Sequence, residues 1–123
     1  MRFAVVCVAM LAMAGGAAFA QTQLEMNEKA GQELRQAEAR MDDVYRGVMD
    51  KISNAGKEAL QAAQETWLNF RNQECAFETM GTTGGSMHPF VVAECRRRLT
   101  GQRIKDLEAQ LNCQEGNVSC GNQ

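Results

Sequence analysis

Residues 63–78 read AQETWLNFRNQECAFE and place the chain's single Trp beside an Arg, a Cys and two Phe on one predicted helix. At 3.6 residues per turn, six side chains of this segment are neighbours at i, i+3 and i+4 spacings: Trp67, Phe70, Arg71, Glu74, Cys75 and Phe77. One broad stripe is therefore apolar and also carries a cation, a carboxylate and a thiol. Such a stripe either builds a site or ties this helix to its neighbours.

The first twenty residues have the features of a secretory signal peptide. Arg2 gives a positive start, residues 3–14 form an almost unbroken apolar run, and residues 18–20 match the A-x-A cleavage pattern. We therefore expect cleavage after residue 20 and export of one domain, residues 21–123, to the periplasm or the cell exterior. The apolar run is shorter than the roughly 20 residues that span a bilayer, so no membrane anchor is expected after cleavage.

The exported part is short and slightly acidic. It keeps 12 Lys and Arg, the chain's 13 less Arg2, and all 15 Asp and Glu, which gives a net charge near −3. This length suits one small domain with a limited core, for which covalent cross-links are useful. An acidic exported domain is not expected to bind nucleic acid.

Four cysteines remain after cleavage: Cys75, Cys95, Cys113 and Cys120. An even number in an oxidising compartment indicates two disulfides, with three possible connectivities. We favour Cys75 with Cys95 and Cys113 with Cys120, so that residues 113–120 form a small closed loop. A zinc site is disfavoured, because the spacing matches no common structural site and the chain has a single His.

Three helical segments account for most of the domain. Thr22 and Glu25 fit a capping box that opens a helix to about residue 52. Residues 53–56, Ser-Asn-Ala-Gly, stop this helix and start a second one, and so short a connection makes the two antiparallel. Glycine-rich residues 81–89 then lead into a third helix. The expected fold is all-α, a small antiparallel three-helix bundle with disulfides.

Apolar spacing predicts which residues of each helix face inward. In the first helix they are Ala30, Leu34, Ala37, Met41, Val44, Val48 and Ile52. In the second they are Leu60, Ala63, Trp67, Phe70 and Phe77. In the third they are Val92, Cys95, Leu99, Ile104, Leu107 and Leu111.

The order of several short motifs resembles the DUF1311 family, also called the lysozyme inhibitor LprI N-terminal domain, over about residues 21–111. The motif residues to which we assign structural roles are Tyr45, Trp67, Phe70, Arg71, Glu74, Thr100, Arg103 and Leu107, and further matches are Glu25, Met26, Asn27, Ala63, Gln64, Cys75 and Cys95. The resemblance implies a small, exported, helical domain and a link to lysozyme inhibition.

The chain departs from the family pattern in its first helix. Lys29 stands near a position where members often have Cys, and Glu38-x-x-Met41-Asp42-x-x-Tyr45 replaces an Asp-x-x-Leu-Asn-x-x-Tyr pattern. Because of the missing Cys, no disulfide map is carried over from the family.

Structural roles are the first interpretation of the central polar residues. Arg71 is expected to form an ion pair with Glu74 or Glu78, because a partly buried guanidinium needs a carboxylate or carbonyl partner. The Thr100 hydroxyl is expected to cap a helix or bond the backbone. Arg103 is expected to reach a Glu of the first or second helix.

Catalysis, cofactors and metals find little support in this sequence. His88 is the chain's only imidazole and has no evident catalytic partner, so we expect no enzyme activity and no cofactor. Residues 96–98, three Arg in a row, spread around a helix rather than forming one anion-binding patch. Methionines spaced along the chain form no copper-binding cluster.

Two functions follow as hypotheses: an exported binding protein that inhibits lysozyme or a related cell-wall hydrolase, or an envelope interaction or structural module without such inhibition. An inhibitor that blocks a cleft needs a protruding loop, and two stretches qualify: residues 82–88 (the 82–88 loop) and residues 114–119 (the 114–119 loop). Their candidate contact residues are Thr82, Ser86, His88, Glu115 and Asn117. Asn117 also begins an Asn-Val-Ser glycosylation sequon. The oligomeric state is not predicted.

Overall fold

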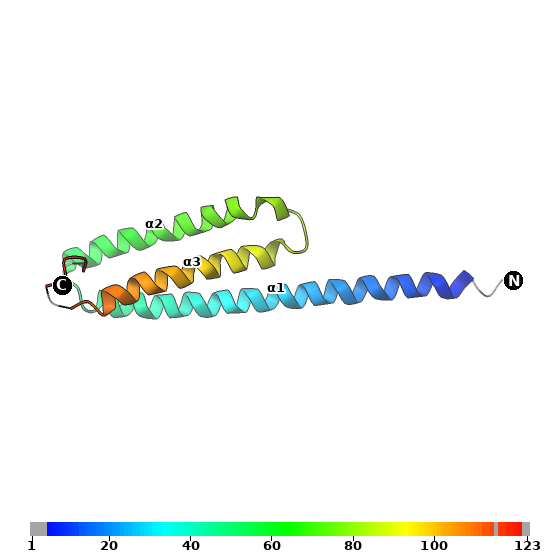
Figure 1. Ribbon diagram of the computed structural model, residues 1–123, viewed down its shortest axis with the longest axis horizontal. Helices are drawn as coiled ribbons and strands as arrows, with labels where there is room; N and C mark the ends of the chain where they lie inside the picture. Colours follow the sequence, from blue (N-terminus) through cyan, green and yellow to red (C-terminus); the bar gives the residue numbers. More distant parts are fainter. Residues whose placement is uncertain (1–4, 115, 122–123) are drawn as a thin grey trace.

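The computed structural model describes residues 5–114 and 116–121, which form three α-helices and one short 3-10 helix (Figure 1). Their bounds are Val5–Met49 for α1, Asn54–Glu78 for α2, Met80–Thr82 for the 3-10 helix η1 and His88–Leu111 for α3. Consecutive helices run in opposite directions, so α1 and α3 point the same way. No strand occurs within the described ranges, and the predicted all-α antiparallel bundle is confirmed.

The capping box predicted at Thr22 does not form in the full chain, because α1 is one helix that passes through this position. Inside a continuous helix the backbone N–H of Glu25 is already bonded one turn back, so it needs no cap. The Thr22 hydroxyl instead donates to the carbonyl oxygen of Ala18 at 3.0 Å. The N-terminal part of α1 extends beyond the ends of α2 and α3 (Figure 1). A cap at Thr22 requires the chain end that cleavage after residue 20 would create.

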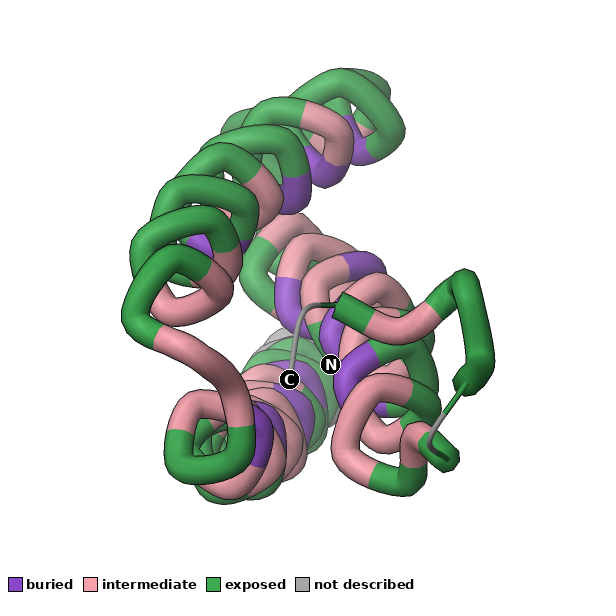
Figure 2. The backbone as a smooth tube through the Cα atoms, turned by 90° about the vertical axis from the view of Figure 1, so that its left-hand side faces the viewer, coloured by how far each residue is buried: buried purple, intermediate pink, exposed green. Residues whose placement is uncertain are grey.

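α1 packs mainly against α3, along a seam of apolar side chains. Met41, Ile104 and Leu107 form its buried centre, and the partly buried residues against them are Val44, Tyr45, Leu60, Trp67 and Leu68. All the predicted inward residues of the first and third helices are buried or half-buried. Figure 2 shows the buried residues on the sides of the helices that face one another.

Gly47 allows the two helices of this seam to approach closely. A Cβ atom added there would lie 3.2 Å from Cδ1 of Leu111 in α3. Just beyond, Lys51 Nζ donates to the Leu111 carbonyl oxygen at 3.2 Å and so bonds a carbonyl that the end of α3 leaves free.

The connections between helices follow local sequence signals. Ser53 caps α2, because its hydroxyl accepts from the backbone N–H of Gly56 at 3.1 Å. At the other end of α2 the Thr79 hydroxyl donates to the Cys75 carbonyl oxygen at 2.6 Å. Pro89 lies in the first turn of α3, where its missing N–H has no helical partner to lose.

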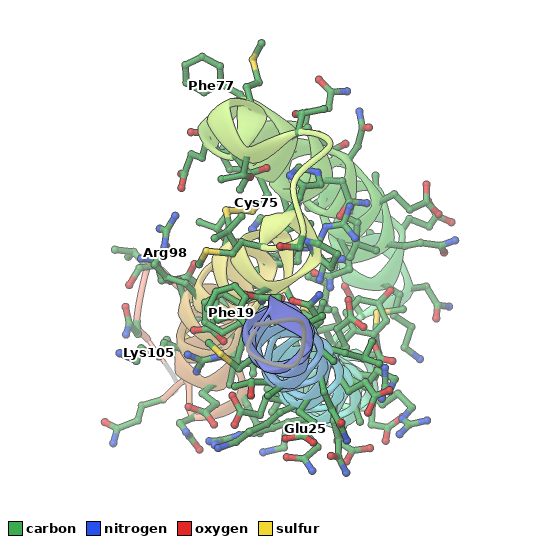
Figure 3. All side chains as sticks on the ribbon, turned by 90° about the vertical axis from the view of Figure 1, so that its right-hand side faces the viewer. Phe19, Glu25, Cys75, Phe77, Arg98 and Lys105 are labelled. Carbon is green, nitrogen blue, oxygen red and sulfur yellow. A yellow bond between two sulfur atoms is a disulfide. The ribbon has the colours of Figure 1, made fainter. Side chains whose placement is uncertain are left out.

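Both favoured disulfides are present. Cys75 joins Cys95 with the Cα atoms 5.7 Å apart, which links α2 to α3 near the loop between them (Figure 3). Cys113 joins Cys120 and closes the segment after α3. Disulfides of this kind are typical of proteins from oxidising compartments.

The predicted inner face of α2 is partly wrong. Leu60 and Trp67 are half-buried against the core, but Ala63, Phe70 and Phe77 are exposed. The buried residues of α2 are instead Gln64, Arg71 and Cys75. Because the disulfide turns Cys75 toward α3, helix geometry places Phe77 about 160° and Phe70 about 140° around the axis from it, both on the far side of the helix. Figure 3 shows Phe77 pointing away from the other helices.

Candidate functional site

Arg71 is the centre of a polar cluster that joins the three helices. Its side chain is 6% exposed, and its Nη1 lies 2.9 Å from Oε1 of Glu38 in α1. The same nitrogen donates to the hydroxyl oxygen of Thr100 in α3 at 3.0 Å. Nε and Nη2 both donate to Asn72 Oδ1, at 3.3 and 3.2 Å. The buried guanidinium therefore has a carboxylate and neutral acceptors, as desolvation requires.

These contacts correct two expectations. Arg71 pairs with Glu38 of α1 rather than with Glu74 or Glu78, and the Thr100 hydroxyl accepts from a side chain rather than bonding the backbone. The inner face of α2 turns Arg71 toward α1, and Glu78 is occupied by Arg98 of α3 at 2.7 Å. Glu38 lies 33 residues earlier in the chain, so no local spacing could identify it.

The indole of Trp67 lies beside two arginines in the same cluster. The guanidinium carbons of Arg71 and Arg103 are 5.6 and 5.8 Å from the ring centroid, within cation–π range. Arg103 Nε donates to Gln64 Oε1 at 2.9 Å, so this Arg binds an amide and not the expected Glu. The Gln64 amide in turn donates to the sulfur of Met41 at 3.5 Å.

Gln64 is the member of this cluster that sequence reasoning did not place in the interior. The signal was present in its spacing, because Gln64 is seven residues before Arg71 and eleven before Cys75, which puts all three on one helical face. The remaining motif residues divide between inside and outside. Tyr45 packs against the core and Leu107 is 1% exposed, whereas Phe70 is 52% exposed.

Arg97 and Arg98 are held apart by separate carboxylates. Arg98 binds Glu78 of α2, and Arg97 binds Glu94 one turn earlier at 2.8 Å and approaches Glu33 of α1 at 3.9 Å. The hydrogen bond from Arg97 lowers the pKa of Glu94 below its ordinary value, and the same bond raises the pKa of Arg97. Arg97 and Arg98 thus contribute ion pairs rather than one anion-binding patch.

The 82–88 loop is a compact turn with several internal hydrogen bonds. The Thr82 hydroxyl donates to the Thr79 carbonyl oxygen at 2.9 Å and lies 2.9 Å from His88 Nδ1. Either atom can be the donor in the second contact, according to the tautomer of His88. Asn27 of α1 donates from Nδ2 to the Ser86 carbonyl oxygen at 3.0 Å. His88 thus holds the loop together, and Ser86 anchors it to α1.

The 114–119 loop lies beyond the end of α3. Asn117 Oδ1 accepts from the backbone N–H of Ser119 at 3.0 Å and from its hydroxyl. Gln110 ties the loop to α3 by donating to the Ser119 carbonyl oxygen at 3.1 Å. Glu115, the other candidate contact residue of this loop, lies outside the described residues.

The two candidate loops lie at opposite ends of the bundle (Figure 1). α3 separates them, and its 24 residues correspond to about 36 Å at 1.5 Å per residue. One enzyme cleft therefore cannot receive both loops of the same molecule.

The described part of the chain was compared with two kinds of site, a metal-binding cluster and a membrane-spanning helix. Within it, no three His, Cys, Asp or Glu side chains gather as they would around a metal ion. None of its helices combines the length and the apolar character needed to cross a bilayer.

The helices, disulfides and polar cluster define a small disulfide-linked helical protein with tightly bonded loops. The family model described as lysozyme inhibitor LprI matches residues 14–107, which include the polar cluster, the 82–88 loop and the first disulfide. The chain therefore belongs to the LprI lysozyme inhibitor family, as the sequence motifs predicted.

The comparison with curated proteins adds one distant relative. An uncharacterised protein of Rhizobium meliloti (strain 1021) is 29% identical over 109 residues, which cover 78% of this chain and 78% of the relative. No solved structure matches the chain significantly.

Proposed function

We propose that this protein is an exported inhibitor of lysozyme or a related cell-wall hydrolase, and that it acts by binding rather than by chemistry of its own. The observation that carries this proposal is the family match over residues 14–107. It is supported by the inward polar cluster, in which Arg71 pairs with Glu38 and Arg103 bonds the Gln64 amide, so that these groups tie the helices together.

Export is part of the same proposal. Residues 1–20 are removed as a signal peptide, and the mature domain begins at Gln21 in the periplasm or outside the cell. The A-x-A pattern and two disulfides support this assignment. The intact mass of the protein recovered from periplasm or medium tests it, and a mass that retains residues 1–20 would contradict it.

The 82–88 loop is the proposed inhibitory element. It lies within the family match, whereas the 114–119 loop lies outside it. Its hydrogen bonds hold it in one shape, so little conformational entropy is lost when it enters a cleft. A surface cleft of about 380 Å³ between α1 and this loop is lined in part by Phe19 and Ala20. Cleavage removes both residues and leaves the loop more accessible.

A lysozyme turnover assay with the purified exported protein tests the function. We expect inhibition that saturates near equimolar protein. Thr83→Glu places a carboxylate on an exposed position of the 82–88 loop, where it would meet the two catalytic carboxylates of such a cleft. We expect this variant to weaken inhibition at least about tenfold, while Asn117→Glu, the matched change in the 114–119 loop, leaves it unchanged.

Two outcomes contradict this proposal at different levels. Equal effects of the two loop variants would remove the 82–88 loop as the inhibitory element. No inhibition at a large molar excess, together with capture of periplasmic partners other than hydrolases, would favour an envelope interaction module instead.

A further inference from the structure

The outward side of α2 carries large apolar side chains that contact solvent. Phe70 is 52% exposed, Phe77 is 69% exposed, and Met80, at the start of η1, is 65% exposed. Single exposed apolar residues are common on protein surfaces, but two Phe and one Met close together on one helical edge are a recognised mark of an interaction surface.

Phe70 and Phe77 lie on one face of α2, opposite its buried residues. Phe70 and Phe77 are seven residues apart, so they project from the same side of the helix two turns apart. Met80 follows Phe77 by three residues. We call the exposed side chains of Phe70, Phe77 and Met80 the outer face of α2.

The unpaired charge beside this face is negative. Glu74 lies about 40° around the helix axis from Phe70 and about 60° from Phe77. It is half-exposed and forms no ion pair with the described residues. The two cations of α2 lie elsewhere, because Arg71 is buried against Glu38 and Lys57 is in the first turn. Arg98 of α3 is already bound to Glu78, so the outer face of α2 is apolar with the unpaired carboxylate of Glu74 at its edge.

The outer face of α2 continues into the 82–88 loop. Met80 and Thr82 are the first and last residues of η1, so the exposed Met is separated by one residue from the start of the loop. The Cys75–Cys95 bond holds this end of α2 to α3, and Glu78 and Arg98 reinforce the contact at 2.7 Å. The aromatic side chains and the loop are thus presented together on a fixed frame.

We propose that the outer face of α2 is the docking surface for the cell-wall hydrolase. The part of the hydrolase that binds this face is a cationic, partly apolar patch beside the active-site cleft of the hydrolase. This inference rests on the proposed function and adds the surface that supplies the affinity. Phe70 and Phe77 fill apolar depressions of the partner, and Glu74 faces a basic side chain of the partner. Aromatic anchors with a charged rim are the usual arrangement at the energetic centre of an interface.

A second copy of this chain is a poorer occupant of the same face. Pairing two outer faces would bring the Glu74 carboxylates of the two copies toward each other, and Arg98, the cation at this end of α2, is already bound to Glu78. Like charges brought together in this way oppose association, whereas a basic partner is attracted before contact.

The decisive experiment combines binding and inhibition with the full exported protein. Affinity for lysozyme is measured by calorimetry, and turnover of the hydrolase is measured in parallel. Phe70→Ser with Phe77→Ser is expected to weaken Kd at least about 30-fold, the loss typical of removing interface hot spots. Val118→Ser, at an exposed apolar residue of the 114–119 loop, is the matched control and is expected to leave Kd unchanged.

The acidic edge is tested separately by charge reversal. Glu74→Lys should slow association about threefold or more at low salt, and the difference should shrink as salt is added. Glu25→Lys reverses one exposed carboxylate of α1 and should have a smaller effect. Thermal melting of every variant shows that the fold is intact. Should the double Phe variant melt early, Phe77→Ser alone, at the more exposed position, replaces it.

The outcomes separate this inference from the function on which it rests. Inhibition that is as strong in the double Phe variant and in Glu74→Lys as in the wild type would overturn the docking surface and leave the inhibitor function standing. Binding that depends on the outer face of α2 but does not inhibit the hydrolase would contradict the inhibitor function and leave the docking surface supported. A wild type that neither binds nor inhibits rejects both. A homodimer in sedimentation that the double Phe variant dissociates would assign the face to a second copy and overturn the inference.

Discussion

The contact between α1 and α3 and the contact of α2 with these two helices are of different kinds. α1 and α3 meet along an apolar seam centred on Met41, Ile104 and Leu107. α2 is held mainly by a disulfide and by the polar cluster around Arg71, with Leu60, Trp67 and Leu68 along its edge. One attachment depends on buried apolar area, and the other depends on a few directional bonds.

This difference explains the unusual surface of α2. Apolar contacts are not directional, so many rotations of a helix satisfy them about equally well. Hydrogen bonds and a disulfide require particular atoms to meet at particular distances. Arg71 and Cys75 therefore fix the rotation of α2, and Phe70 and Phe77 are left on the outside.

The largest expected effect comes from breaking the apolar seam. Leu107→Ala deletes a side chain that is 1% exposed and should lower the free energy of unfolding by about 2–5 kcal/mol. Leu24→Ala, the same change at a residue that is 57% exposed, should cost less than about 0.5 kcal/mol. Urea denaturation measures both. Equal losses would show that this seam is not the principal core.

The disulfide of α2 should have the next largest effect. Replacing Cys75 and Cys95 by Ser reopens a segment whose ends are 20 residues apart in sequence, and should cost about 3 kcal/mol. The matched change at Cys113 and Cys120, 7 residues apart, should cost about 2.5 kcal/mol or less. Denaturation of the purified variants shows which pair of substitutions lowers the free energy of unfolding more. A larger loss at the second pair would mean that α2 is held chiefly by noncovalent contacts.

The polar cluster should contribute less to the free energy of unfolding than the apolar seam or the disulfide of α2. Arg71→Met should lower the free energy of unfolding by about 2 kcal/mol, because the Thr100 hydroxyl loses its partner while Glu38, 35% exposed, regains water. A double-mutant cycle with Glu38→Gln measures the coupling of the pair, which we expect to be about 1 kcal/mol. Zero coupling would argue that the ion pair fixes the rotation of α2 without stabilising the fold.

The smallest expected effect is at Glu94 of α3. Its pKa is lowered from the ordinary 4.5 by the hydrogen bond from Arg97, so its stabilising contribution is present above that pH and is lost as the pH falls through the lowered pKa. Because the pair is exposed, Glu94→Gln should cost less than about 0.5 kcal/mol at pH 7 and nothing at pH 2. Denaturation of both proteins at the two pH values tests this. If the difference in unfolding free energy between the wild type and Glu94→Gln grew toward low pH, the prediction would be contradicted.

Most of the fold could be predicted because its signals are local. The Ser53 cap, the turn near Pro89 and the apolar spacing of the first and third helices each depend on residues close together in sequence. The disulfide pairing followed from the two-helix hairpin that brings Cys75 and Cys95 together. Only part of the polar cluster could be predicted from the sequence. Arg71, Thr100 and Arg103 were identified, but their partners Glu38 and Gln64 were not.

By itself, the sequence determined the helical class, the helix order, the cross-links and the family. The tertiary structure alone decided which side of α2 turns inward and which residues meet there. Helical spacing shows which side chains share a face, but the 63–78 stripe holds polar and apolar groups together, so spacing alone could not choose between them. Contacts with Glu38 of α1 and with Thr100 and Cys95 of α3 made that choice, because those partners lie 33, 29 and 20 residues from the groups they bind.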